Sequence, residues 1–184
     1  LVRFAPVLAA RGARIVLETQ PAIERLVATC PGLAGVVPRG AALPPHDFES
    51  PIASVPRHLG LSADTIPAGV PYLSADSALV ADAQRRIRRD GAFCVGIAWQ
   101  GNPAFPQDCH RSIPLRTFAP LARVPGVRLF SLQKGFGSEQ LATAPFPIED
   151  LGAGLDPGGG AFTDSAAAMA ARDPVIATDS ALVH

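Results

Sequence analysis

The chain has 184 residues, 48% of them hydrophobic, and its 16 basic and 16 acidic side chains cancel to no net charge. This balance argues against a general nucleic-acid binder, which carries a basic excess. No apolar run approaches the ~20 residues that a membrane span needs. The apolar excess instead indicates a parallel β-sheet, whose strands are covered on both faces.

The cysteines indicate a reducing compartment. Cys30, Cys94 and Cys109 are odd in number, widely spaced and without a CxxC pair, which argues against a disulfide framework or a zinc site. The first ten residues are apolar, but Arg3 and Pro6 interrupt them and no signal-peptide cleavage site follows. We therefore expect a cytoplasmic location.

The first part of the chain alternates helices and strands. The predicted elements are a helix over 1–11 that Gly12 ends, a strand over 14–18, a helix over 21–30 with Pro in its first turn, and a short strand at 36–37. Residues 38–75 are rich in Pro and Gly, which indicates an irregular, packed connection.

The second part repeats the alternation with longer apolar runs. Helices are predicted over 77–90, 112–123 and 163–172, and strands over 93–99, 127–132, 148–151 and 175–178. Ser112 is predicted to cap the second of these helices, and Thr163 or Asp164 the third. Residues 152–160 are Gly-rich and predict a flexible loop, and Asp179 is predicted to open a last helix.

Alternating strands and helices predict an α/β protein with parallel sheets that have helices on both faces. We place a domain boundary near residues 75–90, which divides the chain into two α/β halves. The strands at 93–99, 127–132 and 175–178 should be parallel neighbours. Ligands of such sheets bind outside the carboxyl ends of the strands, so the loops after these three strands are the candidate site.

These loops carry polar groups that suit a diphosphate. Asn102 and Arg111 follow the first strand, Lys134 follows the second, and Asp179 with Ser180 follows the third. Basic side chains neutralise phosphate charge, and a helix N-terminus offers free backbone N–H groups to an anion. If Asp179 caps a helix, Ser180 and His184 lie on one face of it.

The same residues also have structural interpretations. A lysine after a strand is usually a solvated charge, Asp-Ser is a common helix cap, His184 fits a core histidine, and the turn at Asn102 needs no ligand. Other chemistries fit poorly: the sequence has no GxxxxGK[ST] loop, no GxGxxG between strand and helix, and no GxSxG motif. The adjacent Asp108, Cys109 and His110 are not expected to share a metal ion.

Four segments carry a family resemblance: DTIPAGVPYL (64–73), VGIAWQGNPAFPQDCHRSIPL (95–115), LFSLQKG (129–135) and DPVIATDSALVH (173–184). They resemble the glycosyltransferase family 9 (heptosyltransferase-like) domains that follow tetratricopeptide repeats in bacterial proteins, and are distantly similar to O-linked N-acetylglucosamine transferases. The resemblance covers nearly the whole chain. It implies a GT-B fold of two Rossmann-like parallel-sheet halves, here truncated at both ends.

In this fold, residues 1–75 would be a partial acceptor-side domain with its connecting segment, and 76–184 a partial nucleotide-sugar-binding domain. The implied donor-binding residues are Lys134, Asp179, Ser180, Ala181, Asn102, Arg111 and His184. Lys134 would meet the donor phosphate, and the turn at 179–181 would hold the diphosphate. The nucleotide sugar is the donor substrate, and neither a cofactor nor a metal is expected, because basic groups and a helix N-terminus stabilise the leaving diphosphate.

The sequence departs from the family at Ser180, where the family has Thr, and at Pro174, where it has Leu. The Gly-rich loop with its Asp, expected before Leu1, and the rest of the nucleotide pocket, expected after His184, are not in the sequence. The resemblance therefore leaves the catalytic residue unknown, and it implies that this fragment is inactive alone although its intact parent is an enzyme.

Three functions remain open at this point. The first is a cytoplasmic glycosyltransferase fragment that moves a sugar from a nucleotide-diphosphate donor to a sugar or protein acceptor, in a parent with upstream tetratricopeptide repeats. The alternative is a non-catalytic module of the same fold that binds a nucleotide sugar or a partner protein. A sugar-nucleotide epimerase would need acidic catalytic residues that the sequence does not point to.

Overall fold

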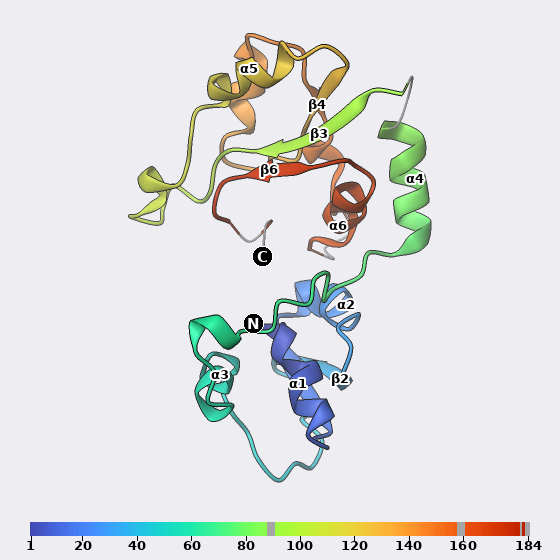
Figure 1. The fold of residues 1–184 in the computed structure, drawn as a ribbon, viewed down its shortest axis with the longest axis vertical. Coiled ribbons are helices and arrows are strands. Elements are labelled where there is room, and N and C mark those ends of the chain that lie inside the picture. Colours follow the sequence, from blue (N-terminus) through green and yellow to red (C-terminus); the bar gives the residue numbers. More distant parts are fainter. Residues whose placement is uncertain (88–90, 158–160, 181, 183–184) are drawn as a thin grey trace. The chain divides into compact units, whose positions relative to one another are not determined.

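The computed structural model describes residues 1–87, 91–157, 161–180 and 182 (Figure 1). The protein is mixed α/β, with one two-stranded and one four-stranded parallel sheet. The described residues divide into two compact units. The first comprises Leu1–Ala75 and a short stretch that ends at Thr163, and the second comprises the rest.

The first unit is built on a parallel strand pair. Its elements in chain order are the 3-10 helix η1 (Val2–Phe4), α1 (Ala5–Ala10), β1 (Ile15–Thr19), η2 (Pro21–Ile23), α2 (Glu24–Val27), β2 (Leu33–Pro38), η3 (Ile52–Ser54), α3 (Val55–His58) and η4 (Ala63–Thr65). Leu17 pairs with Val36 in the β1–β2 ladder. Gly12 ends the first helix with a positive φ of 89°, as predicted.

The single helix predicted over 21–30 is wrong. The segment forms η2, the four-residue α2 and then a turn. In that turn the backbone N–H groups of Thr29 and Cys30 bond to carbonyls three residues earlier, which tightens the chain away from α-helical geometry. The Thr29 hydroxyl also accepts a hydrogen bond from the backbone N–H of Ser74, so a contact distant in sequence stabilises the turn.

The second unit contains the four-stranded sheet, whose order is β5-β4-β3-β6. Its elements are α4 (Ser77–Ile87), β3 (Phe93–Ala98), η5 (Asp108–His110), η6 (Leu115–Phe118), α5 (Ala119–Ala122), β4 (Val127–Ser131), η7 (Ser138–Thr143), β5 (Glu149–Asp150), η8 (Gly152–Gly154), α6 (Thr163–Ala170) and β6 (Val175–Ala177). The three strands predicted to be parallel neighbours are confirmed, with β3 between β4 and β6.

Helices cover both faces of this sheet, so its strands read as continuous apolar runs. Successive residues of β3 alternate between the two faces. Val95, Ile97 and Trp99 pack with Leu115 and Phe118 on the side of α5. Cys94, Ala98 and the residues around them pack with α4 and α6 on the other (Figure 1).

Arg172 is a buried charge on the second of these faces. It is 5% exposed, and none of its guanidinium nitrogens has a hydrogen-bond partner among the described residues. Burial lowers the pKa of Arg172 to about 10. The guanidinium carbon lies 5.6 Å from the centre of the Phe130 ring. Gly96 makes room for it, because a Cβ there would overlap Arg172 Nη1.

Both predicted helix caps in the second unit are wrong. Ser112 does not cap the following helix: its hydroxyl donates to Asp108, and η6 begins only after Pro114. At α6 the capping side chain is Asp156, whose carboxylate accepts the Asp164 backbone N–H (2.7 Å) and the Ser165 hydroxyl (2.7 Å). The capping group of α6 thus comes from the preceding loop, whereas the Leu115 N–H at the start of η6 donates to Gln140 Oε1 at 2.9 Å, from the later helix η7.

The helix predicted to begin at Asp179 lies mostly outside the described residues. Asp179 and Ser180 lie in a bend, and Ala181 and His184 are outside the described residues. Across the described ranges, no helix is long and apolar enough to cross a membrane.

Candidate functional site at the carboxyl edge of the sheet

Gln133 joins the loops that follow β3 and β4. Its Oε1 accepts the backbone N–H groups of Trp99 (2.9 Å) and Gln100 (3.0 Å). Its Nε2 donates to the carbonyls of Gln100 (2.9 Å) and Phe136 (2.6 Å). The side chain is only 4% exposed, so a fully hydrogen-bonded amide fixes the two strand ends to each other.

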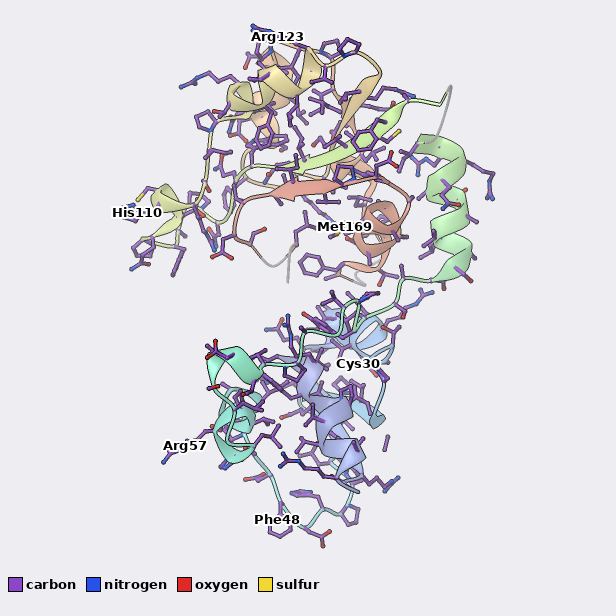
Figure 2. All side chains as sticks on the ribbon, viewed as in Figure 1. Cys30, Phe48, Arg57, His110, Arg123 and Met169 are labelled. Carbon is purple, nitrogen blue, oxygen red and sulfur yellow. The ribbon has the colours of Figure 1, made fainter. Side chains whose placement is uncertain are left out.

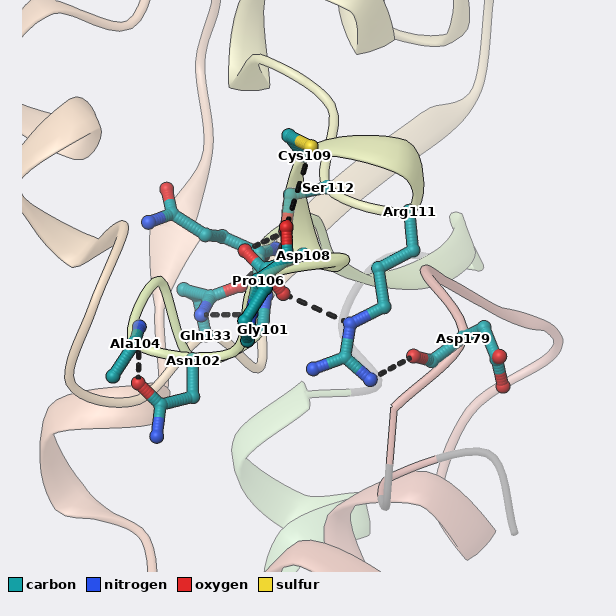
Figure 3. A network of polar contacts seen from close by, with 11 residues as sticks. Gly101, Asn102, Ala104, Pro106, Asp108, Cys109, Arg111, Ser112, Gln133 and Asp179 are labelled. Carbon is teal, nitrogen blue, oxygen red and sulfur yellow. Dashed lines mark hydrogen bonds and ion pairs between the residues drawn. The ribbon is translucent and has the colours of Figure 1, made fainter.

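Asp108 is the centre of a second network, in the loop after β3 (Figure 3). Its Oδ1 accepts from Arg111 Nε at 2.8 Å, and its Oδ2 accepts from the Ser112 hydroxyl at 2.7 Å. The Ser112 oxygen in turn accepts the backbone N–H of Gly101 at 2.9 Å. These contacts close the loop on itself.

The environment of Asp108 favours its charged form. The hydrogen bond from Ser112, followed by the hydrogen bond and charge of Arg111, lowers the pKa of the Asp108 carboxyl below its ordinary value, although burial opposes the shift. The residue is 5% exposed. Asp108 is therefore a buried carboxylate whose two oxygens are both occupied by neighbouring donors.

Arg111 extends this network to the turn after β6. Its Nη1 donates to the backbone carbonyl of Asp179 at 3.0 Å, and its guanidinium carbon lies 5.0 Å from the centre of the Phe105 ring. Figure 3 shows the guanidinium between the Asp108 carboxylate and the Asp179 carbonyl. The structure thus brings together two of the predicted site residues, Arg111 and Asp179.

Lys134 lies in the loop after β4 and bonds to a different part of the unit. Its Nζ donates to the backbone carbonyls of Leu155 (2.6 Å) and Asp156 (3.3 Å), just before α6. It is an exposed residue and the sole lysine of the chain. Because β3 lies between β4 and β6, the strand ends before Lys134 and Asp179 are about 10 Å apart.

Asn102 has a local structural role. Its Oδ1 accepts the backbone N–H of Ala104 at 2.9 Å, which closes a turn in the loop after β3. The residue is exposed. The contact accounts for its position without a ligand. Ser180 lies beside Asp179 in the bend, and the predicted Ser180–His184 face ends outside the described residues.

The structure also shows what Asp108, Cys109 and His110 do. The Asp108 carboxylate is engaged by Ser112 and Arg111, and the exposed Cys109 thiol donates to a neighbouring carbonyl. Over the described ranges, no group of three or more His, Cys, Asp or Glu side chains is arranged to hold a metal ion.

Sequence reasoning missed Gln133, Asp108 and Ser112 as organising residues. A signal for the last two was present: Asp108, Arg111 and Ser112 are spaced i, i+3 and i+4, which places them together in a helical turn. Gly101 gave a second signal. A Cβ there would overlap Asp108 Oδ1 and lie 2.7 Å from Arg111 Nη2.

The chain matches no protein-family model, no curated protein and no solved structure. The chemistry of the site therefore follows from its own residues.

Proposed function

We propose that this chain is the nucleotide-sugar-binding core of a GT-B glycosyltransferase, which moves a sugar from a nucleotide-diphosphate donor to an acceptor. The observation that supports this most is the convergence of three polar loops at one edge of a parallel sheet, with Arg111 hydrogen-bonded to Asp179 across two of them. Ligands of open α/β sheets bind at this edge.

The charges and dimensions of the edge suit a diphosphate. Lys134 and the turn at Asp179–Ser180 flank the end of β3, and a lysine side chain of about 6 Å together with a diphosphate spans the ~10 Å between the neighbouring strand ends. The present partners of Lys134 Nζ are neutral carbonyls. Phosphate oxygens are the stronger acceptors, since charge-assisted hydrogen bonds are about twice as strong as neutral ones.

The site would act chiefly on the leaving group. In the transfer, the acceptor oxygen bonds to the anomeric carbon of the sugar as the bond from that carbon to the diphosphate oxygen breaks. The negative charge that develops on the diphosphate is stabilised by a cation such as Lys134, held in place beforehand. The acceptor proton goes to a base that we do not assign to a residue of this chain.

Calorimetry with uridine, guanosine and adenosine diphosphates tests the proposal. At least one of them should bind, and Lys134→Ala should weaken that binding by roughly 1.5–3 kcal/mol, the contribution of a charge-assisted hydrogen bond. Arg123→Ala is the matched control: Arg123 is exposed at the end of α5, away from the loop that carries His110 (Figure 2). Equal affinity of the wild type and Lys134→Ala for every nucleotide would refute the proposal.

The sole lysine allows a second measurement. The dialdehyde of a periodate-oxidised nucleoside diphosphate condenses with an amine near its binding site to a Schiff base, with loss of water, and borohydride then reduces the C=N bond to a stable amine. We expect mass spectrometry to find the label on the peptide that contains Lys134, and unmodified nucleotide to protect it. Peptide mapping separates this label from any on the amino terminus. Labelling that unmodified nucleotide does not reduce would count against a site at Lys134.

One observation favours the alternative of a non-catalytic module with the same fold. Both basic side chains of the edge, Lys134 and Arg111, already bond to oxygen atoms of the protein itself. A structural role would explain these bonds without a ligand. A donor labelled in its sugar and given to the full-length protein separates the two functions, because a non-catalytic module binds it without transfer or hydrolysis.

A further inference from the structure

The Arg111 guanidinium is divided between two acceptors that belong to the protein. Nε donates to the buried Asp108 carboxylate, and Nη1 donates to the Asp179 carbonyl. These acceptors lie on loops that follow different strands, β3 and β6. A guanidinium makes such a bridge because its N–H groups are fixed in one plane and point in several directions, whereas an ammonium group is a single point of charge.

The Asp108 end of this bridge is rigid. Besides Arg111, the carboxylate accepts the Ser112 hydroxyl, and its residue is almost fully buried. The Asp108 backbone carbonyl also accepts the N–H groups of Arg111 and Ser112. Gly101 packs so closely that a methyl group there would displace the carboxylate. The Asp108 carboxylate therefore anchors the Arg111 guanidinium, and the guanidinium in turn holds the backbone at Asp179.

The Asp179 end lies just beyond the end of the sheet ladder. The sheet ladder ends with the Thr178 N–H, which donates to the Ala98 carbonyl at 3.1 Å, and Asp179 and Ser180 then lie in a bend. The bond from Arg111 to the Asp179 carbonyl fixes the peptide plane between Asp179 and Ser180. Through that plane it orients the Ser180 backbone N–H.

We propose that Arg111 is a positioning residue: anchored by Asp108, it holds the Asp179–Ser180 turn in the conformation that receives the donor diphosphate. The inference rests on the proposed function for the identity of the ligand. Arg111 then acts through the turn after β6, whereas the family resemblance implies that it binds the donor itself.

Arg111→Lys separates positioning from charge. If Arg111 acted only by its charge, lysine would largely replace it. A positioning role predicts that Arg111→Lys loses nucleotide affinity about as strongly as Arg111→Ala, by roughly tenfold to a hundredfold. Asp108→Asn should cause a loss of similar size. Because both changes break one bridge, the double variant should bind no worse than either single variant.

Amide hydrogen exchange without nucleotide supplies the second readout. In Arg111→Lys and Asp108→Asn, the Thr178 amide, which donates to the Ala98 carbonyl where the ladder meets the turn, should exchange roughly tenfold or more faster, while the core amides of Ile97 and Phe130 keep their rates. Arg123→Ala should change neither exchange nor affinity.

Two results would overturn the positioning role. One is wild-type exchange at Thr178 in Arg111→Lys, whatever happens to affinity. The other is faster exchange throughout the core, which would make Arg111 a general stability residue. If Lys134→Ala leaves nucleotide binding unchanged, the proposed function fails, but the exchange measurement still decides the role of Arg111 because it needs no ligand.

Discussion

At the scale of single residues, Arg172 is the least favourable group in the second unit. Its charge is buried on the Phe130 side of the sheet without a hydrogen-bond partner among the described residues. The lowering of the Arg172 pKa to about 10 corresponds to roughly 3 kcal/mol of unfavourable burial. The cation–π contact with the ring face of Phe130 offsets only a part of this cost, on the order of 1–2 kcal/mol.

We expect Arg172→Met to stabilise the protein. The methionine keeps most of the length of the side chain and removes the buried charge, so the free energy of unfolding of the second unit should rise by roughly 1–4 kcal/mol. The buried Trp99, the single tryptophan, reports urea unfolding of this unit through its fluorescence. Arg123→Met, at an exposed position, should change stability by less than about 0.5 kcal/mol. A large loss of stability in Arg172→Met would mean that the charge is paired.

The adjacent residues Gln133 and Lys134 show which single-residue features can be predicted from the sequence and which cannot. Lys134 could be named as a candidate donor-binding residue because a charge after a strand is visible in the sequence. The buried position of Gln133 could not be predicted, since a glutamine is ordinarily exposed. Its partner Trp99 lies 34 residues away, and only the pairing of β3 with β4 brings them together. A buried amide network is a property of the fold and leaves little local signal.

At the scale of elements, α6 depends on Asp156. This residue has a positive φ of 51°, and its carboxylate holds the first turn of the helix through Asp164 and Ser165. In return, the Asp164 carboxylate accepts the Asp156 backbone N–H at 2.9 Å. The loop before α6 and the helix thus cap each other.

Three substitutions at Asp156 separate the cap from the backbone conformation. Asp156→Ala loses the cap and places an unfavourable side chain at positive φ, so it should destabilise the second unit by roughly 1–3 kcal/mol. Asp156→Gly loses only the cap and should cost less. Asp156→Asn keeps one acceptor and tolerates the backbone, so it should cost least. Trp99 fluorescence during urea unfolding measures the order, and a different ranking would contradict the capping role.

The strands were easier to predict than the helix ends. β3, β4 and β6 are apolar runs between polar loops, a pattern that depends only on burial of the strands themselves. The predictions of the two helix caps were wrong for different reasons. Ser112 does not cap η6 because its hydroxyl bonds to Asp108, and the cap of α6 was missed because Asp156 lies eight residues before Asp164 in the sequence. The common carboxyl edge of these strands was therefore predictable, whereas the contacts that organise the loops along it were not.

At the scale of the whole molecule, the four-stranded sheet is uneven in strength. β3 and β4 pair over five residues each and are largely buried, whereas β6 has three residues and is only partly covered. The candidate site includes the end of β6. Of the two strands β4 and β6, local opening is therefore expected to begin at β6.

Hydrogen exchange under native conditions tests this expectation. The Phe130 amide of β4 and the Leu132 amide just after it, which face β3, should exchange more slowly than Ile176 in β6 and Thr178 just after it, because the latter are released by local opening. A saturating nucleotide diphosphate should slow exchange at Thr178 more than at Phe130. Equal protection along the two strands would contradict the prediction.

The order β5-β4-β3-β6 also has a kinetic consequence. Contacts between β3 and β4 join residues such as Trp99 and Gln133, 34 apart, whereas contacts of β3 with the segment before β6 join Cys94 and Asp173, 79 apart. The longer loop costs more entropy to close, so β6 should dock after the folding transition state. Substitutions in β6, such as Val175→Ala, should then mainly accelerate unfolding and leave the folding rate nearly unchanged. A ligand that bridges Lys134 and the turn after β6 would extend the lifetime of the native state without helping the chain to reach it.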